Sequence, residues 1–299
     1  MARMRIVVSL PNDNAYQHEQ GTAAKLAAER LGLDVQVLQA DNDSIVQSQQ
    51  LLEIIQSRSE PRPGAFLVEP VTAMGLRRVA EVAVAQGMAW VVSNSDVDYV
   101  KDLRKDPRVP VFMVSQGQQE IGQLQGQQLA ALLPQGGSVL YIQGPSSSSV
   151  AVQRHEGMET TKPRNVQITT LRSKWSEEGA CESAGAWLRL ATSRAEKFHL
   201  VAGQTHELAL GARKAFQSLD NREQQKRWLA LPFLGIGIAS QVKPLVNNHV
   251  LAAAVITSLT MELAMEMLVR AIEKRVQPPE RSLVEASSYP DLAKLAARK

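Results

Sequence analysis

The chain of 299 residues has a single cysteine, Cys181, so it cannot form an intrachain disulfide, and its cysteine content indicates no redox compartment. No stretch approaches the roughly 20 apolar residues that a membrane span requires. The formal net charge is only +3, and the basic residues are scattered, except for a loose cluster at Lys101, Arg104, Lys105 and Arg108. Because a phosphate-tracking surface needs clustered cations, we expect no nucleic-acid partner and no embedding in a membrane.

Motifs of catalysis and metal binding are also missing. The five histidines show no metal-ligand spacing, and no glutamate stands beside a pair of them as in a zinc site. The chain has no Gly-x-Ser-x-Gly elbow, and neither a Gly-x-Gly-x-x-Gly motif nor a phosphate loop follows the first expected strand. We therefore expect a protein that is not an enzyme and carries no cofactor or metal.

The N-terminus leaves the question of export open. Residues 1–10 are basic and then apolar, but IVVSL is too short for the core of a signal peptide, and no small-residue cleavage site follows. We expect either a cytoplasmic protein or an exported one whose signal has been removed.

Short β-rich runs alternate with helical patterns along nearly the whole chain. With crossovers of this size, the alternation predicts right-handed βαβ units and parallel sheets. The length suits two domains, and 44% hydrophobic with 21% charged residues is ordinary for a globular protein. The expected strands are 5–10, 35–38, 65–68, 90–93, 111–115, 139–142, 166–171, 198–202, 233–238, 251–257 and 283–284. The expected helices are 16–31, 44–56, 73–86, 120–133, one from about 150, 176–190, 207–219, 259–273, and a terminal one begun by Pro290.

One strand–loop–helix stretch, SVLYIQGPSSSSVAVQRHEGM, is the clearest candidate for a binding element. Ligands of parallel α/β sheets gather at the carboxyl ends of the strands, and Arg154 falls about one turn into the helix that follows this strand. A guanidinium presents five N–H donors in a plane, which suits vicinal hydroxyls or a carboxylate. The alternative is a solvated helix-surface arginine beside Glu156.

Several stretches, in this order, resemble type I periplasmic binding proteins of the sugar-binding family, the ribose- and galactose-binding group of solute-binding proteins. They are MRIVVSLPNDNAY, EIGQLQGQQLAALL, IQGPSSSSVAVQRHEGM, HELALGARKAF and LAAAVITS, and the resemblance covers residues 4 to 290. It implies an α/β fold of two doubly wound parallel-sheet lobes joined by three crossings, near Ser115, Ser258 and Gln277. The lobes would comprise residues 1–115 plus 259–277 and residues 116–258 plus 278–299.

The resemblance also implies a function. A small molecule such as a sugar or sugar acid would bind between the lobes, which close by hinge motion, for delivery to the membrane subunits of an ABC importer or for sensing. Such a protein would be a periplasmic monomer. The same fold forms the effector-binding core of LacI-type repressors, whose helix-turn-helix and hinge helix do not fit before Arg5. A cytoplasmic sensor core acting through protein partners is therefore the alternative, and an interaction module without sugar affinity is a third.

The resemblance selects ten ligand-contact candidates, each with a structural alternative. Loop or strand-end polar residues could bind hydroxyls or simply form turns. Tyr16 and Trp175 could stack on a sugar ring or pack at a helix start or edge. Glu69 and Asn94 end the third and fourth expected strands, and Asn94 stands where many sugar binders have an aspartate. The candidates are Asn12, Asp13, Tyr16, Asn94, Gln116, Arg154, Trp175, Gln204, His206 and Ser258.

Three departures from the family pattern concern the expected site. Thr205-His206 stands where the family usually has Asn-Asp, Gly237 replaces an aspartate, and Ser258 replaces a glutamine or asparagine. Sites that read hydroxyls through buried polar groups lose affinity when those groups vanish. The chain could therefore keep the fold of the family and bind a ligand other than the usual monosaccharide. Arg154 and His206 favour an acidic one, and the serines of residues 146–149 could bind an anion or only cap their helix.

Overall fold

The computed structural model describes residues 3–58, 60–190 and 197–297. These form two compact units: unit 1 comprises residues 1–116 and 259–284, and unit 2 residues 117–258 and 285–299. The expected α/β fold with two doubly wound units is confirmed. The expected division differs in Gln116 and in residues 278–284, which belong to unit 1 because Arg281–Val284 pairs with the strand Val111–Gln116.

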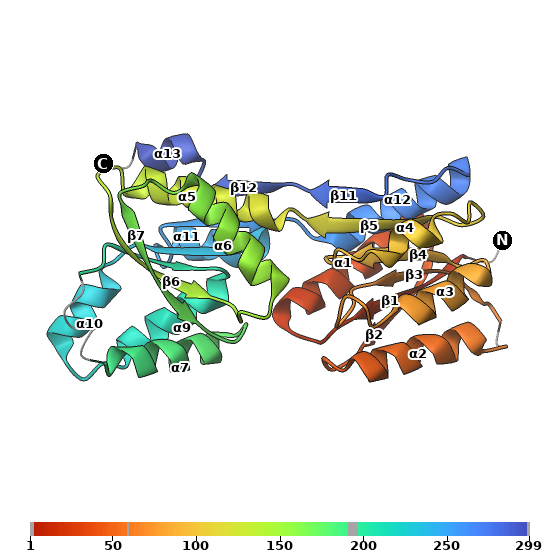
Figure 1. Cartoon of the computed structure of the whole chain (residues 1–299), viewed down its shortest axis with the longest axis horizontal. Coiled ribbons are helices and arrows are strands. Elements are labelled where there is room, and N and C mark those ends of the chain that lie inside the picture. Colours follow the sequence, from red (N-terminus) through yellow and green to blue (C-terminus); the bar gives the residue numbers. More distant parts are fainter. Residues whose placement is uncertain (1–2, 59, 191–196, 298–299) are drawn as a thin grey trace. The chain divides into compact units, whose positions relative to one another are not determined.

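Unit 1 is built on a six-stranded sheet in the order β11-β5-β4-β3-β1-β2, in which every pair of neighbours is parallel (Figure 1). Its central strands are buried on both faces, so they read as continuous apolar runs such as AWVVS. The strands are β1 (Arg5–Leu10), β2 (Asp34–Gln39), β3 (Pro63–Val68), β4 (Ala89–Ser93), β5 (Val111–Gln116) and β11 (Arg281–Val284).

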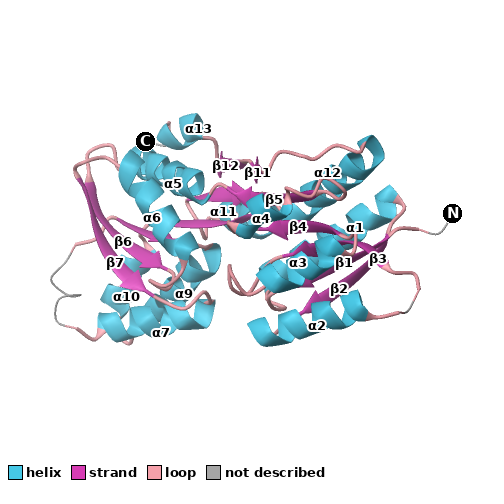
Figure 2. Cartoon of the chain, turned by 45° about the vertical axis from the view of Figure 1, so that its right-hand side comes forward, coloured by secondary structure: helices cyan, strands magenta, loops and turns pink. Residues whose placement is uncertain are grey.

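Helices cover both faces of this sheet. Helices α1 and α12 pack together, while α2 and α3 pack together on the other side (Figures 1 and 2). Asn14 and Asp43 cap α1 and α2 by accepting hydrogen bonds from main-chain N–H groups, as residues of this type do at helix starts. The helices are α1 (Ala15–Leu31), α2 (Ser44–Gln56), α3 (Arg77–Ala85), α4 (Tyr99–Leu103) and α12 (Thr260–Lys274).

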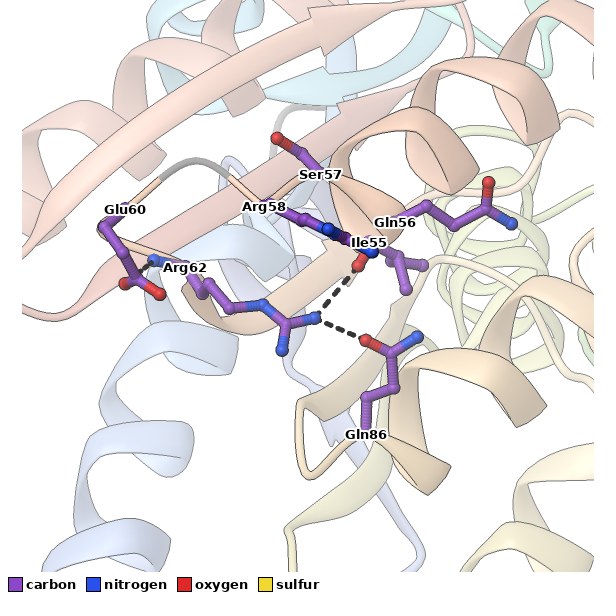
Figure 3. Close-up of a pocket in the computed structure, with 7 residues that line it drawn as sticks. All are labelled: Ile55, Gln56, Ser57, Arg58, Glu60, Arg62 and Gln86. Carbon is purple, nitrogen blue, oxygen red and sulfur yellow. Dashed lines mark hydrogen bonds between the residues drawn. The ribbon is translucent and has the colours of Figure 1, made fainter.

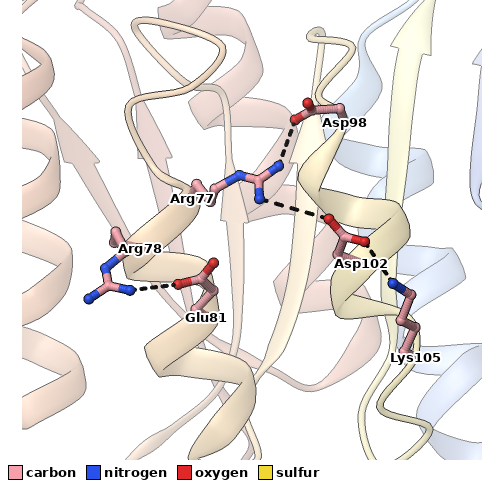
Figure 4. A network of polar contacts seen from close by, with 6 residues as sticks. All are labelled: Arg77, Arg78, Glu81, Asp98, Asp102 and Lys105. Atoms are coloured by element: carbon pink, nitrogen blue, oxygen red, sulfur yellow. Dashed lines mark hydrogen bonds and ion pairs between the residues drawn. The ribbon is translucent and has the colours of Figure 1, made fainter.

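Charged side chains link α3 to α4 (Figure 4). Arg77 lies 3.2 Å from Asp98 and 3.8 Å from Asp102, which also pairs with Lys105 at 2.9 Å. The carboxylates are exposed, so water screens each pair and it contributes little to stability. The network thus orients the short helix α4 rather than stabilising the fold strongly.

Unit 2 repeats the architecture with the strand order β12-β10-β9-β8-β6-β7. All neighbours are parallel except the edge strand β12, which runs antiparallel to β10 and which the sequence did not predict. The strands are β6 (Gly137–Gln143), β7 (Val166–Arg172), β8 (Leu200–Gly203), β9 (Phe233–Ile238), β10 (Ala253–Thr257) and β12 (Ala286–Tyr289).

The helices of unit 2 also lie on both sides of their sheet, α5 and α6 on one and α7 and α9 on the other (Figure 1). Helices α5 and α6 cross closely because glycines line the contact: a Cβ on Gly122 would lie 2.1 Å from the main-chain oxygen of Arg154. The helices are α5 (Gln118–Leu132), α6 (Ser149–Thr161), α7 (Glu177–Leu188), α9 (His206–Gln217), α10 (Arg222–Leu229), α11 (Ala239–Asn247) and α13 (Leu292–Ala296).

Candidate functional site

The hydroxyl of Tyr16 is the centre of a polar cluster in unit 1. Its oxygen accepts hydrogen bonds from Gln20 Nε2 at 2.6 Å, Asn94 Nδ2 at 2.8 Å and Gln116 Nε2 at 3.0 Å. Tyr16 and Gln20 come from the first turns of α1, whereas Asn94 and Gln116 follow or end β4 and β5. Parallel strands bring their carboxyl ends to one edge of the sheet, which is where α/β proteins bind ligands.

Glu69 lies in the same cluster, directly after β3, and is half-buried. Gln17 Nε2 donates to its Oε1 at 2.8 Å, and Asn94 Nδ2 donates to its Oε2 at 3.0 Å. Desolvation raises the pKa of the Glu69 carboxyl to about 7, although the two amide hydrogen bonds act in the opposite direction. The edge of this sheet therefore carries a carboxyl group that is partly protonated near neutral pH.

Buried polar groups behind the cluster hold it in place. Gln20 Nε2 also donates to Thr260 Oγ1 at 3.0 Å, and Thr260 Oγ1 is 2.5 Å from Ser93 Oγ, so α1, α12 and β4 are tied together. Asn94 has a φ of 54°, in the left-handed region that asparagine tolerates better than most residues. This backbone conformation turns the Asn94 amide toward Tyr16 and Glu69.

Asn12 and Asp13 lie in the loop after β1. Asn12 Nδ2 donates to Asn42 Oδ1 at 2.7 Å, and Asn12 Oδ1 accepts from Asn14 N at 3.0 Å. Asp13 is exposed. The two hydrogen bonds of Asn12 hold the turn between β1 and α1.

Arg154 of unit 2 is buried, with 7% of its surface exposed, so it is not the solvated arginine that its helical position also allowed. Its Nε donates to Gln118 Oε1 at 2.8 Å, and its Nη1 donates to the main-chain oxygen of Gln204 at 2.6 Å. These bonds come from the start of α5 and from the loop after β8, so the guanidinium is fixed in one orientation at the carboxyl edge of the sheet.

Gln204 is fully buried, and its side-chain amide is hydrogen-bonded at both ends. Its Oε1 accepts from the Gly144 N–H at 3.0 Å, and its Nε2 donates to the main-chain oxygen of Ala151 at 2.8 Å. Both ends of the amide therefore hold the serine-rich loop between β6 and α6, and Ser148 caps α6 by accepting from Ala151 N. At Ser148 the capping alternative is the one that the structure shows.

The other candidates of unit 2 lie at the same edge with different surroundings. The half-buried Trp175 ring packs over Gly144, where a Cβ would be 2.3 Å from the ring. His206 begins α9, and its Nδ1 lies 3.4 Å from the Ile236 oxygen. Ser258 is exposed and donates to the Glu285 oxygen at 3.1 Å, where two of the chain crossings run next to each other.

Two pockets of unit 1 open elsewhere. A pocket of about 440 Å³ lies between the end of α2 and the start of β3, where Arg62 donates to the Ile55 oxygen at 3.1 Å and to Gln86 (Figure 3). A second, of about 450 Å³, is lined by residues near the starts of β3, β4 and β5, including Gly64, Ala89 and Pro110. Both are at the amino edge of the sheet, away from the strand ends that carry Tyr16 and Asn94.

The structure thus brings Tyr16, Asn94 and Gln116 into one cluster, and places Arg154 on a rigid support. The sequence marked Glu69 only as a strand-end residue and gave no reason to select Gln17 or Gln20. A carboxyl at the end of a buried strand is a usable signal for Glu69, whereas the two glutamines on α1 follow no pattern.

Within the ranges that the structure describes, no group of three or more His, Cys, Asp or Glu side chains could hold a metal ion. None of the described helices combines the length and hydropathy needed to cross a membrane.

Comparison with known proteins gives a family and a fold. The family model described as "Periplasmic binding protein domain" matches residues 6–275. No curated protein matches the chain. Similar solved structures include an ABC transporter solute-binding protein from Actinobacillus succinogenes with bound D-allose, with a TM-score of 0.79, 14% identity, and coverage of 99% of this chain and 100% of that chain.

Two further structures are similar over their whole length. The arabinose ABC transporter's binding protein from Shewanella, bound to L-arabinofuranose, has a TM-score of 0.78, 16% identity, and coverage of 99% of this chain and 96% of that chain. A solute-binding protein from Bacillus halodurans with bound myo-inositol has a TM-score of 0.74, 17% identity, and coverage of 100% and 99%. At these identities the likeness establishes the fold.

Proposed function

We propose that this chain, which belongs to the periplasmic binding protein domain family, binds a sugar or sugar derivative without transforming it. Similar structures hold D-allose, L-arabinofuranose and myo-inositol, all of which are neutral and polyhydroxylated. The bound molecule would be delivered to an ABC importer or reported to a sensor. We place the protein in the periplasm as a monomer.

The observation that carries this proposal is the cluster around Tyr16 in unit 1. It combines a phenol, a carboxyl and four amides, those of Gln17, Gln20, Asn94 and Gln116, from three strand ends and one helix. A sugar hydroxyl both donates and accepts, so it matches amides and carboxyls that offer both functions. A phenol ring adds an apolar face for the C–H groups of a sugar.

The ligand contacts are assigned to the carboxyl edge of each sheet. In unit 1 the assigned residues are Asn12, Asp13, Tyr16, Asn94 and Gln116, to which the cluster geometry adds Glu69. In unit 2 they are Arg154, Trp175, His206 and Ser258. Gln204 completes the set in unit 2, and its amide also holds the loop before α6.

The test is a thermal-shift screen of the purified protein against two sets of compounds. The neutral set holds D-allose, L-arabinose, D-fructose and myo-inositol, and the acidic set holds D-gluconate, D-glucuronate and glucose 6-phosphate. A ligand present at a hundred times its Kd stabilises a protein by roughly 2.7 kcal/mol, which gives a clear shift in Tm. A shift with a neutral compound supports the proposal. A shift with acidic compounds alone would identify the ligand as an acidic sugar derivative and would point to Arg154 and His206 as its charged contacts. No shift with any compound would contradict the proposal.

A further inference from the structure

The pocket of about 450 Å³ at the amino edge of the sheet of unit 1 has the size of a small-molecule site. Its inner wall is apolar, because Ala89 at the start of β4, Val109 before β5 and Ala271 on α12 line it and are all buried. None of the ten ligand-contact candidates is among the residues that line it. The pocket is therefore a separate apolar cavity, at the edge of the sheet opposite to the expected sugar contacts.

Hydrogen bonds join the two walls of this cavity. Gln277 Nε2 donates to the main-chain oxygen of Val109 at 2.6 Å, and Gln277 Oε1 accepts from Val111 N at 3.1 Å. Arg104 Nη2 donates to the main-chain oxygen of Pro278 at 2.8 Å. These bonds fix the segment that follows α12 to the start of β5. Both walls thus belong to the folded framework of unit 1, and the cavity is pre-formed, as small-molecule sites usually are.

Arg275, which lines the cavity just after α12, has an unusual backbone conformation. Its φ is 53°, and the N–H groups of Arg275 and Val276 donate to the oxygens of Ile272 and Ala271, which is the Schellman arrangement of a helix end. Glycine is the usual residue here, because a Cβ is unfavourable in the left-handed region. The other non-glycine residues of the described chain with positive φ are of types that tolerate this region better, namely Asp41, Asn42, Asn94 and His249. The arginine therefore carries a conformational cost, and such outliers cluster at functional sites.

Arg275 also supplies the available charge of the cavity. Of the described residues that line it, only Arg108 and Arg275 are ionisable. Arg108 is bound to Asp106, whose two carboxylate oxygens each lie 2.9 Å from Arg108 Nε. Arg275 is exposed and forms no ion pair with any described carboxylate, while its neighbours on α12, Glu273 and Lys274, carry opposite charges and do not line the cavity. An uncompensated guanidinium therefore stands at the rim of an apolar cavity.

Two apolar side chains are exposed beside this guanidinium. Ile272 has 36% and Val276 has 61% of its surface exposed, and both line the cavity. Single exposed apolar residues are common on proteins, but here they continue an apolar wall outward to a cation. Covering them with an apolar group would remove their surface from water, which is favourable. The surface thus matches a molecule with an apolar body and a negatively charged end.

We propose that this cavity is a second binding site, which takes a small amphiphilic carboxylate with its acyl chain against the apolar wall and its carboxylate on Arg275. A guanidinium offers parallel N–H groups that match the two oxygens of a carboxylate. A neutral amphiphile of the same length lacks the charge for this contact, and a cationic one is repelled. The site lies within unit 1 and does not depend on the proposed binding of a sugar.

The test uses octanoate as the probe, with 1-octanol and octylammonium as neutral and cationic compounds of the same chain length. Each is titrated into the wild-type protein by calorimetry at pH 7.5 and low salt, below its micelle concentration. We expect octanoate to bind saturably, with one molecule per chain, and more tightly than the other two. Added NaCl should weaken its binding, because the charged contact lies at an exposed rim. No saturable binding of octanoate, or equal binding of the three compounds, would overturn the proposal.

The Arg275→Gly variant locates the site and separates a lost contact from a lost fold. Glycine relieves the backbone at this position, so the Tm of the free protein should rise. Loss of the guanidinium should raise the Kd of octanoate about tenfold and leave that of 1-octanol unchanged.

Two further variants complete the test. Ile272→Ser removes apolar surface from the rim and should weaken both octanoate and 1-octanol. Arg270→Ala, which removes an exposed arginine of α12 that does not line the cavity, is the matched control and should keep both Kd values. A wild-type Kd for octanoate in Arg275→Gly, or an equal loss of octanoate binding in Arg270→Ala, would overturn the assignment of the carboxylate to Arg275.

Discussion

The imidazole of His206 lies over Gly237, so closely that a Cβ on residue 237 would be 2.7 Å from Nδ1 of the ring. Both positions depart from the pattern of the sugar-binding family, which the chain otherwise resembles. The two departures are linked in the structure, because the His206 ring occupies the space that a side chain at position 237 would need.

This relationship predicts coupled stabilities. Gly237→Ala should lower the free energy of unfolding by about 1–3 kcal/mol through overpacking. In a His206→Ala background the cost should be smaller but not zero, because Val242 also lies within 2.8 Å of the added Cβ. A double-mutant cycle by urea unfolding measures the coupling. Additive effects of the two substitutions would show that the ring does not restrict position 237.

The support of Arg154 depends on the close crossing of α5 and α6. Gly122→Ala should destabilise the protein by about 3 kcal/mol, because the new methyl group meets main-chain atoms of Arg154 that cannot move aside without shifting the helix. Gly185→Ala on α7 is the matched control. Among the described residues, no atom beyond its chain neighbours and its own helix backbone lies within 4 Å of the added Cβ, so it should be neutral or gain up to about 1 kcal/mol. Equal stability of the two variants would contradict the close crossing.

Arg154→Ala should abolish ligand binding and lower stability by about 1–3 kcal/mol. Removing the guanidinium leaves the Gln204 oxygen and Gln118 Oε1 without the donor that they have in the structure. Arg154→Lys keeps the charge but not the planar fork, so it should retain the fold better than the affinity. The exposed Arg164→Ala is the control. Near-normal affinity of Arg154→Ala in calorimetry would refute the placement of the site.

Glu69 should make the protein less stable as the pH rises from about 4.5 to 7. Its pKa is raised from 4.5 to about 7 by folding, so in this range the folded state holds a proton that the unfolded state has lost. The extra stability is complete below the unfolded pKa, is lost as the pH rises through the folded one, and amounts to about 3 kcal/mol at most. Urea unfolding at pH 4.5, 6 and 7.5 should show this loss in wild type and in Glu53→Gln but not in Glu69→Gln. A parallel loss in Glu69→Gln would assign it to another group.

Most of the fold could be predicted because strands and helices alternate with clear apolar runs. The helix 44–56 and the strands 5–10 and 233–238 have the predicted bounds. The sequence missed α4, α10, α11 and β12. Helix α10 is short and almost entirely polar, α11 is short and contains Pro244, and β12 is a four-residue edge strand with two serines. Each is therefore too short or too polar for its pattern to stand out.

The candidate site could be predicted only in part. The sequence could select Tyr16, Asn94 and Gln116 because the strand ends and the first helix of such folds meet at one edge of the sheet. The partners that define their geometry come from far away in the chain: Gln20, for example, bonds to Thr260, 240 residues later. Hydrogen bonds between polar residues at such separations leave no periodic signal. For the same reason the burial of Gln204 and its bonds to Gly144 and Ala151 became visible only in three dimensions.

The most direct test of the proposed function is a calorimetric titration of the wild-type protein with the neutral compound that gives the largest thermal shift, followed by mass analysis of the recovered compound. The account predicts saturable binding with one molecule per chain, and a ligand that is recovered unchanged. No heat of binding with any neutral sugar or polyol of the screen, or a ligand converted to another compound, would contradict it.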